Sequence, residues 1–240
     1  FRRTEFLEVE RYGKFEAYSN GDSLKYRSVY GLDDILTLYR GTIRRVGFSR
    51  AWNMFVQLGM TDDSYILEGS ENMSYRQFIN SFLPYHPTDS VEIKTRLILK
   101  IDQDDIMWDK LLELDLFNPD KKVNLPNATP AQILEKILTD SWALEPEDKD
   151  MIVMYHKFGY ELNGEKKQID SKMVCIGEDQ TYTAMAKTVG LPVAIATLLI
   201  LNGKITTPGV QLPIKKEVYE PILKELEEYG VIFNEQNVPY

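Results

Sequence analysis

An apolar run near the carboxyl end of the chain constrains its fold more than any other segment. Residues 181–205 read TYTAMAKTVGLPVAIATLLILNGKI, and from 189 to 201 only a glycine, a proline and a threonine interrupt the apolar side chains. A run of about 10–14 apolar residues is too short to cross a bilayer and is typical of a helix in a protein core. Because proline has no backbone N–H, we expect this helix to kink or restart near Gly190. The segment therefore predicts a buried helix, whose small side chains let a neighbouring backbone or a ligand come close.

Helix-start signals recur through the middle of the chain. Ser74 with Gln77, and Thr129 with Gln132, form capping boxes ahead of apolar residues at helical spacing. A proline follows the first of these apolar stretches and is expected to end it. We therefore predict an all-helical insertion over residues 31–145.

The spacing of apolar residues changes to two after Pro146. The next residues alternate in polarity, Asn163–Gly164 is a typical two-residue hairpin turn, and a returning strand follows over residues 169–176. The first residues of the chain alternate in a similar way. We expect residues 1–30 and 146–214 to belong to part of a mixed β-sheet domain with packed helices, so the predicted fold class is α/β (α+β).

The charge of the chain argues against nucleic acid as a partner. The 240 residues carry a net charge of −9, whereas binding to nucleic acid needs a basic surface. The single cysteine, Cys175, excludes an internal disulfide and indicates a reducing compartment. Because no signal peptide, membrane span or lipidation motif is visible, we expect a cytoplasmic protein without a membrane partner.

Three arginines form the densest basic cluster of the chain: Arg40, Arg44 and Arg45. If this segment is helical, Arg40 and Arg44 lie one turn apart and form a fork that binds a carboxylate. The simpler interpretation, which we favour, is that these arginines pair with Asp33, Asp34 or another domain.

Other candidate sites have simpler structural interpretations. Thr183 and the amides after it form a helix start that is able to receive an anion, although packing of the same helix is the interpretation we favour. The acidic segment 102–113 lacks the sharp-turn glycine of a calcium loop, and His86 and His156 lack the spacing of a metal pair. We therefore expect no metal site.

Five segments, in this order along the chain, resemble the family of NADP-dependent, glutamate-forming saccharopine dehydrogenases (saccharopine reductases). They are Tyr18–Tyr26 (YSNGDSLKY), Leu38–Arg44 (LYRGTIR) with the following Gly47–Phe48, Asp148–Met154 (DKDMIVM), Thr183–Gly203, and Val218–Leu223 (VYEPIL) with Gly230. The chain departs from the family at Gly21, where the family usually has an arginine. The resemblance covers most of the chain.

The resemblance implies an oxidoreductase of lysine metabolism. Such an enzyme transfers hydride between NADP and the secondary amine of saccharopine, the adduct of aminoadipate semialdehyde and glutamate. No strand–GxGxxG–helix unit occurs in the sequence, so we expect the Rossmann domain and the catalytic groups upstream of Phe1. On this interpretation the chain is the C-terminal catalytic and dimerisation portion, which alone binds no cofactor and is inactive. Residues 215–240 would return toward the missing nucleotide-binding domain.

The resemblance also implies the residues that border the substrate. The segment around Asn20 and Asp22 is most simply a turn, and its match to the family motif places it beside the substrate cleft. The substrate-binding candidates are therefore Asn20, Asp22, Arg40, Arg44 and Thr183, with a small amino-acid substrate and a second copy of the chain as partners.

Two alternatives remain open at this point. One is a carboxynorspermidine dehydrogenase-like reductase of polyamine synthesis, because the acidic chain suits a cationic amine. The other is a non-catalytic dimerisation module in which the hairpin of residues 151–176 pairs across a two-fold axis.

Overall fold

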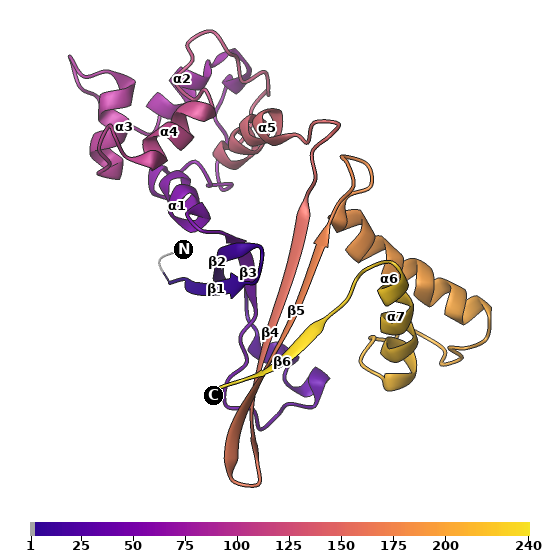
Figure 1. Ribbon diagram of the computed structural model, residues 1–240. Helices are drawn as coiled ribbons and strands as arrows, with labels where there is room; N and C mark the ends of the chain where they lie inside the picture. Colours follow the sequence, from indigo (N-terminus) through magenta and orange to yellow (C-terminus); the bar gives the residue numbers. More distant parts are fainter. Residues whose placement is uncertain (1–2) are drawn as a thin grey trace. The chain divides into compact units, whose positions relative to one another are not determined.

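The chain folds into two compact units. The computed structural model describes residues 3–240 (Figure 1). The helical unit contains the residues up to Asn20 together with Arg44–Ala143, and the sheet unit contains Gly21–Ile43 together with Leu144–Tyr240. Helices and antiparallel sheets are mixed, which confirms the predicted fold class. The four-part division of the chain proposed from the sequence stays a prediction.

The helical unit begins with a β-hairpin and continues as five helices. Strands β1 (Glu5–Val9) and β2 (Gly13–Ser19) pair antiparallel. Strand β3 (Gly41–Arg45) is next to β2 in the strand order, and the chain passes from the sheet unit to the helical unit within β3. The helices are α1 (Phe48–Leu58), α2 (Tyr75–Asn80), α3 (Val91–Leu99), α4 (Ile106–Glu113) and α5 (Pro130–Trp142), with a 3-10 turn at Ser70–Asn72. All five helices lie inside the block 31–145 that was expected to be helical.

Both predicted capping boxes are confirmed. The Ser74 hydroxyl accepts a hydrogen bond from Gln77 N at 3.1 Å, and the Gln77 side chain accepts one from Ser74 N at 2.8 Å. Thr129 and Gln132 exchange the same pair of bonds at 3.3 and 3.0 Å. Apolar side chains that follow these caps, such as Phe78, meet in one continuous core under the five helices.

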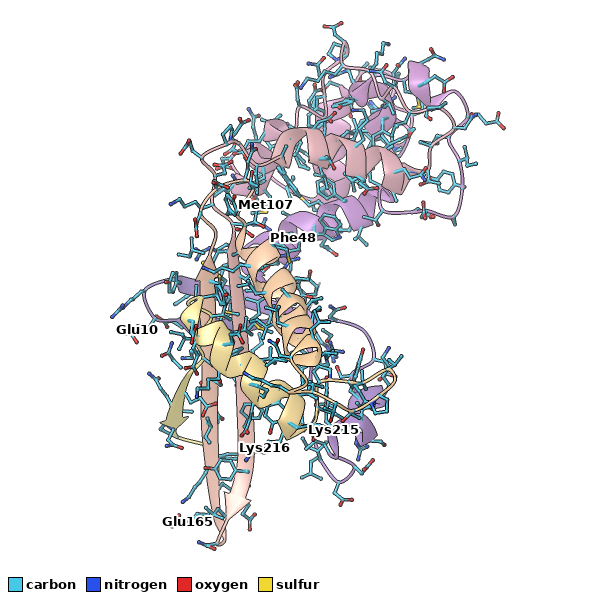
Figure 2. All side chains as sticks on the ribbon, turned by 90° about the vertical axis from the view of Figure 1, so that its right-hand side faces the viewer. Glu10, Phe48, Met107, Glu165, Lys215 and Lys216 are labelled. Carbon is cyan, nitrogen blue, oxygen red and sulfur yellow. The ribbon has the colours of Figure 1, made fainter. Side chains whose placement is uncertain are left out.

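The sheet unit is built on the predicted hairpin. Strands β4 (Met151–Leu162) and β5 (Glu165–Ile176) pair along their whole length, and β6 (Asn234–Val238) adds to the other edge of β5. Asn163 and Gly164 have φ angles of 55° and 82°, which a type I′ turn requires and which explains the residues at this position. Glu165 marks the turn end of the hairpin in Figure 2.

Two long helices lie together on one side of this hairpin, α6 (Ala184–Leu201) and α7 (Lys216–Glu228) (Figures 1 and 2). Their core includes Met173 and Cys175 of β5, and burial raises the pKa of the Cys175 thiol. Residues 210–212 form no strand, and the last strand of the described chain begins at Asn234. Two short 3-10 helices, η1 (Leu24–Tyr26) and η2 (Ser28–Tyr30), complete the sheet unit.

The structure corrects the prediction of a buried helix at residues 184–201. Only 17% of α6 is buried, mainly through Ala184, Ile195 and Leu199, while Val193 is 65% exposed. The physical reason is that the helix packs one side on the sheet, and residues 3–240 provide no second layer over the opposite side. Of the two outcomes expected near Gly190, a kink or a restart, the restart does not occur, because α6 continues through Pro192. The kink itself stays a prediction.

Candidate functional site

The turn after β2 holds one of the predicted substrate contacts in a defined conformation. Asp22 Oδ1 accepts a hydrogen bond from Leu24 N at 2.9 Å and so starts the 3-10 helix η1. The next residue, Ser23, accepts a hydrogen bond through its hydroxyl from Arg40 N at 3.0 Å. This second bond joins the two ends of the segment Gly21–Ile43, so the structure brings the Asp22 turn and Arg40 together. The predicted Asx turn at Asp22 is confirmed.

Arg40 lies against an aromatic ring of the same segment. Its guanidinium carbon is 4.2 Å from the ring centroid of Tyr26, which is within the range of a cation–π contact. A hydrogen bond with Arg40, assisted by the charges of Lys25 and Arg40, lowers the pKa of the Tyr26 phenol. The ring of Tyr26 also stacks on that of Tyr30, with 6.0 Å between centroids. The segment therefore presents a positive, exposed patch whose arginine is oriented by a phenol ring.

The favoured interpretation of Arg40 was a pair with Asp33, Asp34 or another domain, and pairing with another domain stays a prediction. Within residues 3–240 no ion pair joins Arg40 to Asp33 or Asp34. Instead, Arg27 donates to the main-chain carbonyl of Asp33, and the Ser28 hydroxyl donates to its carboxylate at 2.6 Å. The guanidinium of Arg40 is held by the Tyr26 phenol rather than by a carboxylate, so its positive charge is not paired with an acidic side chain.

Arg44 belongs to a strand and not to a helix. It lies in β3, so the expectation that Arg40 and Arg44 stand one helical turn apart is wrong. Its guanidinium carbon is 5.4 Å from the ring centroid of Phe48, the first residue of α1. Asn20 and Arg44 fall in the helical unit, whereas Asp22, Arg40 and Thr183 fall in the sheet unit.

The start of α6 is already occupied by a carboxylate. Thr183 is the N-cap, and its hydroxyl accepts from Ala186 N at 2.9 Å. The Asp150 carboxylate accepts from Ala184 N at 2.5 Å and from Met185 N at 2.8 Å. Because these amides and the positive end of the helix dipole face Asp150, the anion position expected here is filled from within the chain.

Another carboxylate, which is buried, binds the amides at the start of α1. Glu16 of β2 is only 5% exposed and accepts hydrogen bonds from Gly47 N at 3.2 Å and from Ser49 N at 2.5 Å. The sequence analysis did not identify Glu16 or Asp150. A signal was available for Asp150, because it lies in the quoted segment DKDMIVM directly before β4.

Residues 3–240 hold no cluster of metal ligands and one long apolar helix. No group of three or more His, Cys, Asp or Glu side chains in residues 3–240 is arranged to hold a metal ion. One helix of the described chain, α6, is long and apolar enough to cross a membrane by length and composition alone. The core helix of a soluble protein passes the same test, so this feature is weak evidence for a membrane span.

Comparisons with known proteins place these features in a family. The model of the saccharopine dehydrogenase C-terminal domain matches residues 1–231. The mitochondrial alpha-aminoadipic semialdehyde synthase of Rattus norvegicus is 34% identical over 229 residues, which are 92% of this chain and 24% of that protein. The Saccharomyces cerevisiae saccharopine dehydrogenase (NADP+, L-glutamate-forming) is 33% identical over 235 residues, which are 93% of this chain and 51% of that protein.

A solved structure agrees with these sequence matches. The apo histidine-tagged saccharopine dehydrogenase (L-Glu forming) of Saccharomyces cerevisiae superposes with a TM-score of 0.85 and 29% identity. The match covers 99% of this chain and 55% of that one. The chain therefore spans about half the length of the dehydrogenases, and about a quarter of the synthases, that it matches.

Proposed function

Because the chain belongs to the saccharopine dehydrogenase C-terminal domain family, we propose that it is the C-terminal portion of an NADP-dependent saccharopine dehydrogenase of lysine metabolism. The observation that carries this proposal is the match of 99% of the chain to a saccharopine dehydrogenase structure with a TM-score of 0.85. The proposed enzyme oxidises saccharopine at the carbon beside its secondary amine and releases aminoadipate semialdehyde and glutamate, or catalyses the reverse reaction. The names of the matched proteins favour this substrate over carboxynorspermidine.

NADP does not fit the starts of helices α1 and α6. A dinucleotide pyrophosphate binds where free main-chain amides and the positive end of a helix dipole meet it. At α1 and α6 these amides already bind the carboxylates of Glu16 and Asp150, and a phosphate at either place meets a negative charge. We therefore propose that NADP binds to a part of the enzyme outside residues 1–240, and that this chain supplies substrate contacts.

Within the proposed enzyme, Arg40 is the substrate contact that the geometry supports best. Saccharopine carries three carboxylates, and a guanidinium binds a carboxylate through two parallel N–H bonds. Tyr26 orients the guanidinium, and Ser23 fixes the backbone of Arg40. Asp22 shapes the turn that precedes Ser23, because its carboxylate accepts from Leu24 N. Asn20, Arg44 and Thr183 remain proposed contacts of the same substrate.

A pair of arginine substitutions tests this role in the full-length gene product. Arg40→Lys keeps the charge but removes the bidentate geometry, so we expect the KM for saccharopine to rise about tenfold with the KM for NADP unchanged. Arg50→Lys is the matched control, because Arg50 is exposed on α1 and pairs with Asp105. An unchanged saccharopine KM in Arg40→Lys contradicts the assignment of Arg40.

Calorimetry tests the proposal that NADP binds outside the 240-residue chain. We expect no heat of NADP binding with the 240-residue chain, and both NADP binding and saccharopine oxidation with the full-length product. Binding of NADP to the 240-residue chain contradicts the placement of the cofactor. A full-length product that oxidises carboxynorspermidine and not saccharopine contradicts the proposed substrate.

We also propose that the enzyme is a cytoplasmic homodimer. The exposed apolar residues of α6 support a partner surface, and β4 is an edge strand of its sheet with Met154 and Phe158 exposed. These observations also favour the second candidate function, a dimerisation module. The cytoplasmic location is supported by a single, buried cysteine and is tested by microscopy of the tagged full-length protein.

Sedimentation of a charge variant tests the dimer. Val193→Glu places a carboxylate on the exposed face of α6 and is expected to shift the full-length protein from dimer to monomer. Lys224→Glu on the exposed side of α7 is the control and should leave the dimer intact. A dimer that persists in Val193→Glu contradicts the use of α6, and a wild-type protein that sediments as a monomer contradicts the dimer itself.

A further inference from the structure

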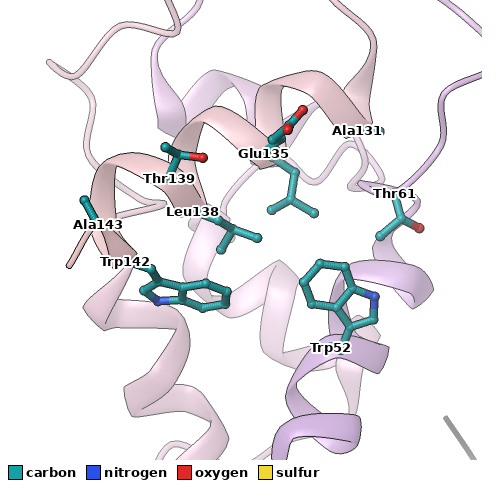
Figure 3. A pocket seen from close by; sticks show the side chains of 9 residues that line it. Trp52, Thr61, Ala131, Glu135, Leu138, Thr139, Trp142 and Ala143 are labelled. Atoms are coloured by element: carbon teal, nitrogen blue, oxygen red, sulfur yellow. The ribbon is translucent and has the colours of Figure 1, made fainter. Parts of the chain in front are cut away.

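The helical unit contains an open groove between two tryptophans that the proposed function does not use. The groove has a volume of about 540 Å³ and lies along α5, with Trp52 of α1 on one side and Trp142 of α5 on the other (Figure 3). Leu134 and Leu138, 3% and 8% exposed, form its apolar base. Ligand sites typically occupy roughly 300–1,000 Å³ and are mainly apolar with a few polar groups, and this groove fits that description.

The two indoles are held in different ways. Trp52 stacks on Phe48 with 5.8 Å between centroids and meets Phe55 edge-on at 5.8 Å, so its ring is a fixed wall. Trp142, the last residue of α5, is 56% exposed although indole is among the most costly side chains to leave in water. A ligand that covers the Trp142 ring removes that surface from water, which favours an occupant with an aliphatic or aromatic body.

The charge of the residues that line the groove favours a positively charged ligand. Glu135 is the one charged residue that lines it in the described structure, and no ion pair or side-chain hydrogen bond engages Glu135 within residues 3–240. The next residue, Lys136, lies outside the lining and pairs with Asp140 at 2.5 Å. The groove therefore offers a carboxylate and no cation.

The spacing of residues on α5 aligns the carboxylate with the apolar surface. Glu135, Leu138 and Trp142 follow one another by three and four positions, so they lie along one stripe of the helix. Thr139 adds a hydroxyl to the same groove. A positive group beside Glu135 thus has its hydrocarbon body directed along the helix toward an indole, and the faces of indole rings attract cations.

From this arrangement we propose that the groove between Trp52 and Trp142 binds an organic ammonium ion with an alkyl or aryl body. The ammonium group pairs with Glu135, and the body lies over Leu138 between the two indoles. An organic anion is disfavoured by the same carboxylate, and a neutral alcohol of equal length lacks the ion pair.

Nuclear magnetic resonance of the indole N–H groups tests the proposal on the 240-residue chain. The chain has three tryptophans, and Trp108 is buried in the helical core, so its signal is an internal control. Titration with n-hexylammonium chloride is expected to shift the Trp52 and Trp142 signals saturably and to leave Trp108 in place. Hexan-1-ol should bind about fivefold more weakly, since an exposed ion pair contributes at most about a factor of five. Hexanoate should bind more weakly still.

Two variants and a control separate this site from general attraction of cations to an acidic protein. Glu135→Gln should reduce hexylammonium affinity to that of hexan-1-ol, and Trp142→Ala should weaken both ligands. Glu227→Gln, on the exposed side of α7, removes an equal charge elsewhere and should have no effect. The proposal is overturned if hexylammonium shows no saturable shift of Trp52 and Trp142, if the alcohol binds equally well, or if Glu135→Gln and Glu227→Gln behave alike.

Discussion

Gly177 is the position at which a single methyl group should most disturb the sheet unit. It follows β5, and a Cβ built there lies 2.2 Å from Asp150 Oδ1, 2.9 Å from Ala184 N and 3.1 Å from Thr183 Cα. Contacts under 3.0 Å are essentially never seen for real Cβ atoms. The conflict is one of space alone, because the φ angle of Gly177 is not in the left-handed region.

The expected loss of stability can be worked out from the displacement of the Asp150 carboxylate. To reach 3.0 Å, the Asp150 carboxylate has to shift by at least 0.8 Å, which weakens its hydrogen bonds to Ala184 N and Met185 N. Overpacking of this kind costs about 1–3 kcal/mol, and loss of a helix N-terminal contact costs about 1 kcal/mol. Gly177→Ala should therefore lower the free energy of unfolding of the sheet unit by about 2–4 kcal/mol.

Urea denaturation followed by hydrogen exchange measures this change. All three tryptophans lie in the helical unit, so fluorescence follows that unit while exchange of the α6 amides follows the sheet unit. Gly190→Ala is the matched control: Gly190 lies inside α6 with nothing within 4 Å of its Cβ position, so alanine should stabilise the helix by about 0.5–1 kcal/mol. Unchanged protection of α6 in Gly177→Ala would refute the role given to Asp150.

Three further predictions concern charge and capping. Hydrogen bonds from Arg76 lower the pKa of Glu92 to about 2. The pair therefore stabilises the fold fully above the ordinary pKa of 4.5, and this stabilisation is lost as the pH falls toward 2. In a urea titration, Glu92→Gln should lower the free energy of unfolding by about 1 kcal/mol at pH 7 and by almost nothing at pH 2. Burial lowers the pKa of His156, so its neutral form contributes stability that is present above its ordinary pKa of 6.5 and is lost as the pH falls below that value. His156→Gln should therefore show a smaller fall in urea midpoint on acidification. Thr129→Ala should lower the unfolding free energy by about 1 kcal/mol, measured by tryptophan fluorescence.

Each of these three predictions has a result that contradicts it. An equal loss in Glu92→Gln at both pH values would show that the pair acts by packing and not by charge. An equal fall in His156→Gln would assign the pH dependence to other groups. Full stability in Thr129→Ala would mean that Pro130 alone is sufficient to start α5.

Local signals were the part of the fold that the sequence predicted well. The capping boxes at Ser74 and Thr129 and the turn at Asn163–Gly164 each depend on residues within four positions of one another. The backbone conformation there is decided by side-chain bonds to nearby amides, or by the ability of glycine to adopt a positive φ angle. Such features do not depend on the rest of the chain, so they can be inferred without it.

Burial and long-range contacts were harder to infer for an equally physical reason. The apolar sequence of α6 is the same whether a second layer covers it or not, so composition cannot distinguish a core helix from one with an open face. Residues 31–145 were expected to be all-helical, but Gly41–Arg45 within them form strand β3. The Ser23–Arg40 bond spans 17 residues and depends on the fold of the whole segment.

The carboxylates of Glu16 and Asp150 occupy the amides at the starts of α1 and α6, so arginine side chains are the groups left to bind an anionic substrate. Glu16 of β2 accepts from amides 31 and 33 residues later, and Asp150, directly before β4, accepts from amides 34 and 35 residues later. Phosphates commonly bind at helix N-termini, but at α1 and α6 the chain's own carboxylates already occupy that position. Recognition of a carboxylate substrate then falls to guanidinium groups such as Arg40, whose donors are oriented by Tyr26 and not consumed by an acidic side chain. On this argument, Asp150→Asn should leave saccharopine binding by the full-length enzyme unchanged when the protein is folded, whereas Arg40→Lys should not.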